Sequence, residues 1–170
     1  MSAYLYKATS SMDDFEDYYR IKSDPSAILW SGFATAPQRE KLLAHYQLLM
    51  NNIINNGGQY LYFLKESGTN ALIGYDLMTQ IDDNTIESSG HSILSEFQGK
   101  GFGNLLFKLL VDEAKKLGYK RFTGWISENN IGSIRNVEHS GFVRTDESKI
   151  VRLAALNRED IFYKYERILG

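Results

Sequence analysis

Three glycines at alternate positions, Gly99, Gly101 and Gly103, form the segment of this sequence best suited to bind a ligand. They lie between a strand-like run, residues 85–94, and an amphipathic stretch with helical spacing, residues 102–117. Glycine has no Cβ atom, so the backbone can turn tightly and direct several N–H groups into one concavity. With the N-terminus of the following helix, these N–H groups predict a phosphate site. A glycine-rich turn that binds nothing is the alternative interpretation.

Two common nucleotide-binding motifs do not fit this loop. A P-loop requires Gly-Lys followed by Ser or Thr, which binds Mg²⁺, but Lys100 is followed by Gly101. A dinucleotide-binding loop requires the spacing G-x-G-x-x-G after the first strand of its domain. Here Asn104 follows Gly103, and the loop lies beyond the midpoint of the chain. The phosphate ligand therefore belongs to neither class.

At this loop the sequence resembles the GNAT superfamily of acyl-CoA-dependent N-acyltransferases. Residues 98–103, Gln-Gly-Lys-Gly-Phe-Gly, match that family's pyrophosphate loop, Q/R-x-x-G-x-G/A. The segment from Asn130 to Phe142 resembles the N-x-x-S…E-x-x-G-F signature of the branch that contains the ribosomal-protein N-terminal acetyltransferases. The first eighty residues resemble the family only in the order of their elements.

The resemblance implies an α/β (α+β) fold with a central mixed, mostly antiparallel, twisted sheet of six to seven strands. About four helices would flank this sheet, and strands 4 and 5 would splay apart in a V. The implied activity is N-acetyl transfer from acetyl-CoA to a primary amine, by direct attack in a ternary complex without a covalent acyl-enzyme. Acetyl-CoA would be the acyl-donor cosubstrate, and no metal would be needed.

The resemblance also implies where the cofactor binds. Backbone groups of Ile93 and Leu94 are expected to hold the pantetheine arm, which adds to the gap between the splayed strands like a further strand. Gly90 is expected to mark a bulge that opens this gap. The expected cofactor-binding residues are Ile93, Leu94, Gln98, Gly99, Lys100, Gly101, Phe102, Gly103, Asn130, Ser133 and Asn136.

Asn130, Ser133 and Asn136 recur every three residues, which places them on one face of a short helix. Asn130 is also suited to cap that helix, and Ser140-Gly141 to end it. Capping alone is sufficient to explain Asn130, whereas the resemblance implies that Ser133 and Asn136 reach the cofactor.

Acyl transfer to an amine calls for a base, since an alkylammonium with a pKa near 10.4 is only about one part in a thousand neutral near pH 7.4. Glu87 is the preferred base, because it precedes Gln98 by 11 residues, where the resemblance places the catalytic glutamate of histone-acetyltransferase members. On an uninterrupted strand Glu87 and His91 share a face, so His91 is a second candidate, as base or water relay. The alternatives are a solvated strand residue for Glu87 and a packed or hydrogen-bonded histidine for His91.

The sequence departs from the family at the general acid. Many members carry a tyrosine seven residues after the motif asparagine, which reprotonates the CoA thiolate, and here that residue is Val137. Ser133 is the nearest remaining hydroxyl. The thiolate can also leave unprotonated, because a thiol with a pKa of about 8.5 is a good leaving group.

The acceptor side is expected, from family position, at the loop 27–37 and at the strands around Tyr75 and Tyr165. Trp30, Phe33 and Tyr75 are the expected substrate-binding residues. Trp30 and Phe33 would form an apolar or sugar-stacking wall. The alternative is that both side chains only pack beneath the loop. No acidic run near this loop indicates a strongly cationic acceptor. We expect a small amine or amino sugar; protein N-terminal or lysine acetylation, or non-catalytic acyl-CoA binding, are the alternatives.

Composition limits the remaining functions. A length of 170 residues predicts one domain, residues 1–170, and a net charge of −2 argues against nucleic-acid or membrane-surface partners. The chain has no cysteine, and its three histidines are far apart, so no metal site is expected. Without a membrane-spanning apolar run or a signal-peptide pattern, a cytoplasmic protein is expected, as a monomer or homodimer.

Periodicity predicts the elements that must position these residues. Asp24-Pro25 is expected to break the first helix and to begin a loop. Strands are expected near residues 4–8, 59–65, 71–80, 85–94, 121–126, 142–153 and 161–168. Helices are expected over residues 11–21, 38–55, 102–117 and 131–140.

Overall fold

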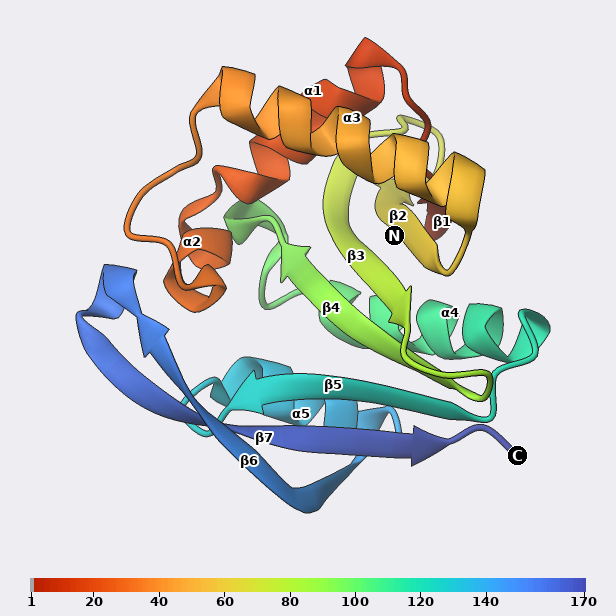
Figure 1. Cartoon of the computed structure of the whole chain (residues 1–170), viewed down its shortest axis with the longest axis vertical. Coiled ribbons are helices and arrows are strands. Elements are labelled where there is room, and N and C mark those ends of the chain that lie inside the picture. The colour runs from red at the N-terminus through yellow and green to blue at the C-terminus, as the bar shows by residue number, and fades with distance from the viewer. Residues whose placement is uncertain (1) are drawn as a thin grey trace.

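Seven strands form one twisted sheet through the centre of the computed structural model, which describes residues 2–170 (Figure 1). They are β1 (Ala3–Lys7), β2 (Gln59–Glu66), β3 (Leu72–Gln80), β4 (Thr85–Ile93), β5 (Arg121–Ser127), β6 (Val143–Leu153) and β7 (Arg158–Ile168). Their order is β1-β2-β3-β4-β5-β7-β6. Neighbours pair antiparallel except β4 and β5, which are parallel. The expected mixed, mostly antiparallel sheet is confirmed.

The parallel pair β4–β5 joins the two halves of the sheet over only part of its length. Pairing runs from Thr85–Arg121 to Ser88–Gly124, and beyond these residues the two strands diverge (Figure 1). The expected V-shaped splay between strands 4 and 5 is therefore confirmed. It leaves one end of the sheet open between the C-terminal parts of β4 and β5.

Within residues 2–170, five helices flank the sheet (Figure 1). On one face α1 (Met12–Lys22) and α3 (Arg39–Asn56) enclose a core that includes Phe15, Tyr18, Tyr46, Leu61 and Phe63. Helix α2 (Pro25–Ser31) has no buried residue and lies against β4. On the other face α4 (Phe102–Lys116) and α5 (Ile131–His139) pack on a core that includes Ile86, Leu106, Leu110, Phe122 and Phe142. Short 3₁₀ turns follow β4, at Ser95–Phe97, and β6, at Ala154–Leu156.

Helix α2 corrects the expectation of a loop over residues 27–37. The Asp24 carboxylate caps this helix by accepting a hydrogen bond from the Ser26 N–H at 3.0 Å. Pro25 occupies the first turn, where its fixed φ suits a helix and its missing N–H needs no partner. Asp24-Pro25 thus ends one helix and begins another. The loop starts at Gly32, whose left-handed φ of 87° ends α2.

A β-bulge interrupts β4 at Ser89. Leu77 of β3 pairs with Gly90, but the next residue, Met78, pairs with Ser88, so Ser89 is an additional residue on β4. The expectation of a bulge at Gly90 is therefore confirmed, with the extra residue immediately before it. A bulge shifts the alternation of side chains between the two faces of a strand.

This shift separates Glu87 from His91. Ser88 and His91 lie on the α4 face, where both contact Asp76 of β3. Glu87 precedes Ser88 on the regular part of the strand, so its side chain lies on the opposite face and contacts Thr123 of β5. The expected shared face for Glu87 and His91 is wrong, because the strand is interrupted between them.

Candidate active site

A pocket of about 1160 Å³ occupies the open end of the V. Its walls come from the end of α1, from α2 and the loop after it, from the first turns of α3, from Tyr75 of β3 and residues 89–93 of β4, from the glycine loop with the start of α4, and from the start of α5. Most of the residues expected to bind a ligand line this pocket: Trp30, Phe33, Tyr75, His91, Ile93, Gln98, Gly99, Gly101, Phe102, Gly103, Asn130, Ser133 and Asn136. Glu87, Leu94 and Lys100 are not among its lining residues.

The glycines of the loop are required for two different reasons. Gly99 and Gly101 have φ of 73° and 86°, the left-handed region in which a side chain is strained. A Cβ atom on either would meet no protein atom within 4 Å, so the space beside them is free for a ligand. Gly103 has ordinary backbone geometry, but a Cβ there would overlap the Asn136 amide of α5. The loop thus fits a pyrophosphate held by backbone N–H groups at the N-terminus of α4.

Helix α5 presents Ser133 and Asn136 to the pocket. The Asn130 carboxamide accepts a hydrogen bond from the Ser133 N–H at 3.3 Å, so its role as N-cap is confirmed. Asn136 packs over Gly103, which fixes α5 against the start of α4. Val137 is 2% exposed within the hydrophobic core and supplies no proton donor at the position where many family members have tyrosine.

The backbone of β4 offers fewer free groups than expected. The Leu94 N–H donates to a β3 carbonyl, Ile73 O, at 2.8 Å, so it points away from the gap. By alternation, Ile93 and His91 direct their backbone groups toward the gap. The Ile93 carbonyl already accepts hydrogen bonds from Ser26 Oγ at 3.2 Å and Gln98 Nε2 at 3.1 Å. The Ile93 N–H and the backbone N–H and C=O of His91 therefore remain available to form hydrogen bonds with a ligand in the gap.

His91 is held by a buried carboxylate that sequence reasoning did not identify. Asp76 is fully buried, and its Oδ2 accepts hydrogen bonds from His91 Nδ1 at 2.9 Å and Ser88 Oγ at 2.5 Å. The imidazole also stacks on Phe107, with ring centroids 4.3 Å apart. Desolvation raises the pKa of Asp76 above its usual range, and the hydrogen bonds from His91 and Ser88 oppose this shift. When the ring carries a single proton on Nδ1, which donates to Asp76, Nε2 is the nitrogen that can accept a proton.

Glu87 lies away from this arrangement. Its Oε1 accepts a hydrogen bond from Thr123 Oγ1 at 3.2 Å, within the part of the sheet where β4 and β5 still pair. The side chain is half-buried at the closed end of the V. It therefore does not face the pocket that contains the glycine loop.

Tyr75 and Lys22 form the wall beside the bulge. A Cβ atom on Gly90 would lie 2.8 Å from the Tyr75 hydroxyl, which places that hydroxyl next to the bulge. Lys22 Nζ donates to the same hydroxyl at 3.3 Å. Burial raises the pKa of Tyr75, and desolvation lowers the pKa of Lys22. Among the pocket residues of the described chain, Tyr75 is the only tyrosine.

Two aromatic side chains line the pocket on its α2 side, Trp30, which is partly buried, and Phe33, which is 67% exposed; together they are called the aromatic rim. Within residues 2–170, His, Cys, Asp and Glu side chains nowhere gather in a group of three or more that suits a metal ion. Nor does any helix of these residues have the length and apolar character needed to cross a membrane.

A sheet that splays between its fourth and fifth strands, with a glycine-rich helix N-terminus at the opening, defines the class of acyl-CoA-dependent acyltransferases. The sequence model of the acetyltransferase (GNAT) domain matches residues 5–143. The chain belongs to this family and is an acetyl-CoA-dependent N-acetyltransferase. No curated protein sequence matches it significantly.

Solved structures with the same fold include a spermidine N-acetyltransferase from Vibrio cholerae in complex with CoA and spermine. It is 16% identical, with a TM-score of 0.80, and the match covers 98% of this chain and 95% of that one. A phosphinothricin acetyltransferase from Sinorhizobium meliloti in complex with AcCoA is 20% identical, with a TM-score of 0.77, over 100% of this chain and 90% of that one. A GNAT-family acetyltransferase from Bacillus anthracis is 17% identical, with a TM-score of 0.76, over 99% and 98%.

Proposed function

We propose that this protein transfers the acetyl group of acetyl-CoA to a small primary amine by direct attack in a ternary complex. The observation that carries the proposal is that one pocket joins the glycine loop, the β4 bulge and a separate rim of aromatic side chains. Such a pocket has room for donor and acceptor at once, so no covalent acyl-enzyme is needed. A cytoplasmic location and a monomeric or homodimeric state are also predictions.

The cofactor would be held mainly by backbone groups. The N–H groups from Gly99 to Gly103 and the N-terminus of α4 bind the pyrophosphate, with Ser133 and Asn136 beside them. The Ile93 N–H and the backbone groups of His91 bind the pantetheine amides. Lys100 is exposed, with its Nζ 5.6 Å from the centre of the Phe97 ring, and contributes at most weak attraction to the phosphates. Bound acetyl-CoA supplies the reactive thioester.

His91 is the base that we favour. It accepts the ammonium proton at Nε2, directly or through water, while the nitrogen–acetyl bond forms and the carbon–sulfur bond breaks. Asp76 is a positioning residue, because it fixes the ring orientation and keeps the proton on Nδ1. Glu87 remains the alternative base. Its contact with Thr123, away from the lining of the pocket, argues against this role.

The leaving thiolate requires no acid from α5. Val137 cannot donate a proton, and Ser133 is the nearest hydroxyl on that helix. Tyr75 is a further hydroxyl beside the bulge, and its raised pKa keeps it protonated. We propose that the thiolate departs unprotonated, since its acidity is close to that of a cysteine thiol, with a pKa of about 8.5.

A thiol-release assay with a panel of primary amines tests the function, and calorimetry measures acetyl-CoA binding. Gly101→Val should weaken binding at least tenfold, because a β-branched residue is strained at φ 86° and its side chain fills the ligand space. Lys100→Ala, the adjacent exposed residue, is the matched control and should change affinity less than threefold. Wild-type affinity in Gly101→Val would refute the pyrophosphate site, and binding without thiol release from any amine would indicate an acyl-CoA-binding protein.

A further inference from the structure

The charged side chains that line the pocket are all basic. Its lining residues include three basic side chains, Lys22, Lys41 and Arg135, and two histidines, but no aspartate or glutamate. Within residues 2–170, none of these three cations has a carboxylate within 4.0 Å. The whole chain carries a net charge of −2, so this cationic lining is not a consequence of overall composition.

The cations lie at different parts of the pocket. Arg135 is next to Asn136 on α5, beside the glycine loop, so it is placed for the phosphates of the donor. Lys22 is at the far side, because its Nζ contacts the Tyr75 hydroxyl and that hydroxyl lies beside Gly90 of the bulge. Lys41 is exposed on α3 at the outer wall. The donor phosphates therefore do not account for Lys22.

Burial of the Lys22 ammonium without a carboxylate partner lowers the stability of the folded protein. Its ammonium lies 5.8 Å and 5.5 Å from the ring centres of Tyr18 and Tyr75, which fix its position without neutralising its charge. A lysine in the last turn of α1 gains the same attraction to the helix dipole when it is fully solvated. Its burial lowers its pKa, and only a bound anion would compensate the unfavourable free energy of this desolvation.

We propose that the amine acceptor carries a carboxylate or phosphate group, which binds to Lys22 and enters past Lys41. This inference rests on the proposed transfer to a small amine and narrows the acceptor to an amino acid or an amino-phosphate compound. Trp30 and Phe33 at the rim accommodate an apolar part of such a molecule. A polyamine is disfavoured, because its added cations meet only positive charge in this pocket.

Matched acceptor pairs distinguish the two anions and the neutral amine. Thiol release is measured with phenylalanine against phenylalaninamide, with phosphoethanolamine against ethanolamine, and with spermidine. A hydrogen bond to a charged group is worth about 1.5–3 kcal/mol, which converts to roughly 10- to 150-fold. We expect kcat/KM for at least one anionic acceptor to exceed that of its neutral partner by this factor, and the better pair identifies the anion.

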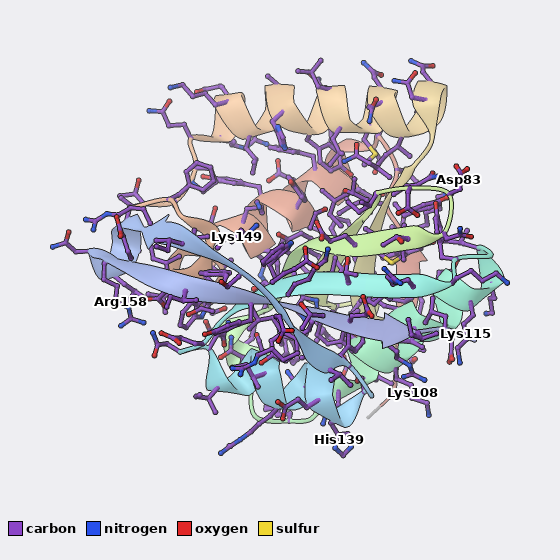
Figure 2. All side chains as sticks on the ribbon, turned by 60° about the horizontal axis from the view of Figure 1, so that its bottom comes forward. Asp83, Lys108, Lys115, His139, Lys149 and Arg158 are labelled. Carbon is purple, nitrogen blue, oxygen red and sulfur yellow. The ribbon has the colours of Figure 1, made fainter. Side chains whose placement is uncertain are left out.

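The variant Lys22→Met retains the length of the side chain and its contact with the two rings but removes the charge. It should reduce the anionic-to-neutral ratio of kcat/KM tenfold or more. Lys115→Met is the control of equal charge change. Lys115 lies in the last turn of α4, at the end of the molecule away from α2 (Figures 1 and 2), and its replacement should leave the ratio within twofold.

Binding is measured in parallel by titrating phosphoethanolamine and phenylalanine into the protein saturated with CoA. Equal kcat/KM values within both pairs, a preference for spermidine, or a ratio unaffected by Lys22→Met would overturn the inference while acetyl transfer itself stands. If no amine releases thiol, the proposed function fails. In that case, wild-type binding of phosphoethanolamine or phenylalanine that is lost in Lys22→Met still supports the anion site. If the wild type binds neither compound, the anion site is refuted.

Discussion

Replacement of Asp76 by asparagine tests the role of His91 with almost no change of shape. In the wild type, Asp76 Oδ2 accepts hydrogen bonds from His91 Nδ1 and Ser88 Oγ, whereas the buried Oδ1 has no partner among residues 2–170. An asparagine can place its amide nitrogen at either position. At the Oδ1 position, the N–H groups would be buried without an acceptor.

At the Oδ2 position, the amide nitrogen donates to Ser88 Oγ and to His91 Nδ1. His91 must then carry its proton on Nε2, and a neutral ring in that form cannot accept the ammonium proton there. A buried donor without an acceptor costs about 1–3 kcal/mol. The Nε2–H form is therefore favoured by roughly 5- to 150-fold, since 1.36 kcal/mol is a factor of ten.

The thiol-release assay at pH 7 with saturating acetyl-CoA should show kcat reduced by that factor, with KM for acetyl-CoA changed less than twofold. ¹⁵N NMR of the His91 imidazole should show that the protonated nitrogen changes from Nδ1 to Nε2. A merely structural role for Asp76 would not produce this change of tautomer together with an unaltered KM.

The control is Glu87→Gln, the same change from carboxylate to amide on β4, at a residue that contacts Thr123 and does not line the pocket. It should reduce kcat less than threefold. An unchanged kcat in Asp76→Asn with the tautomer reversed would refute His91 as the base. A hundredfold loss in Glu87→Gln, with none in Asp76→Asn, would assign the base to Glu87.

Two further predictions follow from Gly103 and Lys22. Gly103→Ala should raise KM for acetyl-CoA several-fold, because its Cβ displaces the Asn136 amide. The control is Gly132→Ala, whose Cβ would meet no atom within 4 Å and which should leave KM unchanged. Equal KM values for the two variants would contradict this packing role of Gly103. Lys22→Met should raise the Tm, because burial of the ammonium disfavours the folded state. Since the folded-state pKa of Lys22 lies below its unfolded value near 10.4, the folded wild type loses the proton first as pH rises, so the Tm difference should shrink at alkaline pH. A Tm difference that grows with pH, measured by calorimetry, would contradict the assigned cause.

The glycine loop and α4 were predictable because their information is local. Left-handed glycines and a periodic apolar stripe over 102–117 require no knowledge of distant residues, and α4 begins at Phe102 as expected. The V-shaped splay is confirmed too, but it came from the resemblance to a family rather than from the strands themselves. Helix α2 is not predicted, because a proline that ends one helix equally suits the first turn of the next, as Pro25 does here.

The arrangement around His91 depends on register, which the sequence alone did not provide. Asp76 and His91 are directly opposite on β3 and β4, and the bulge at Ser89 decides which residues of β4 share their face. One signal was available: an aspartate within the otherwise apolar run of β3 indicates a buried carboxylate that needs a partner. Lys22 gave no such signal, since a lysine in the last turn of a helix is common.

The carboxylate that begins α2 also reaches the segment that leads to the glycine loop. Besides Ser26, Asp24 accepts hydrogen bonds from Ser95, at 3.1 Å from its N–H and 2.7 Å from its hydroxyl. One side chain, Asp24, thus caps α2 and also holds Ser95, in the segment that precedes the glycine loop. Any shift of Ser95 that accompanies donor binding alters the start of α2, and a shift of α2 alters the loop in return. By thermodynamic linkage, a donor that changes the affinity for the acceptor through this contact would have its own affinity changed by the acceptor by the same factor.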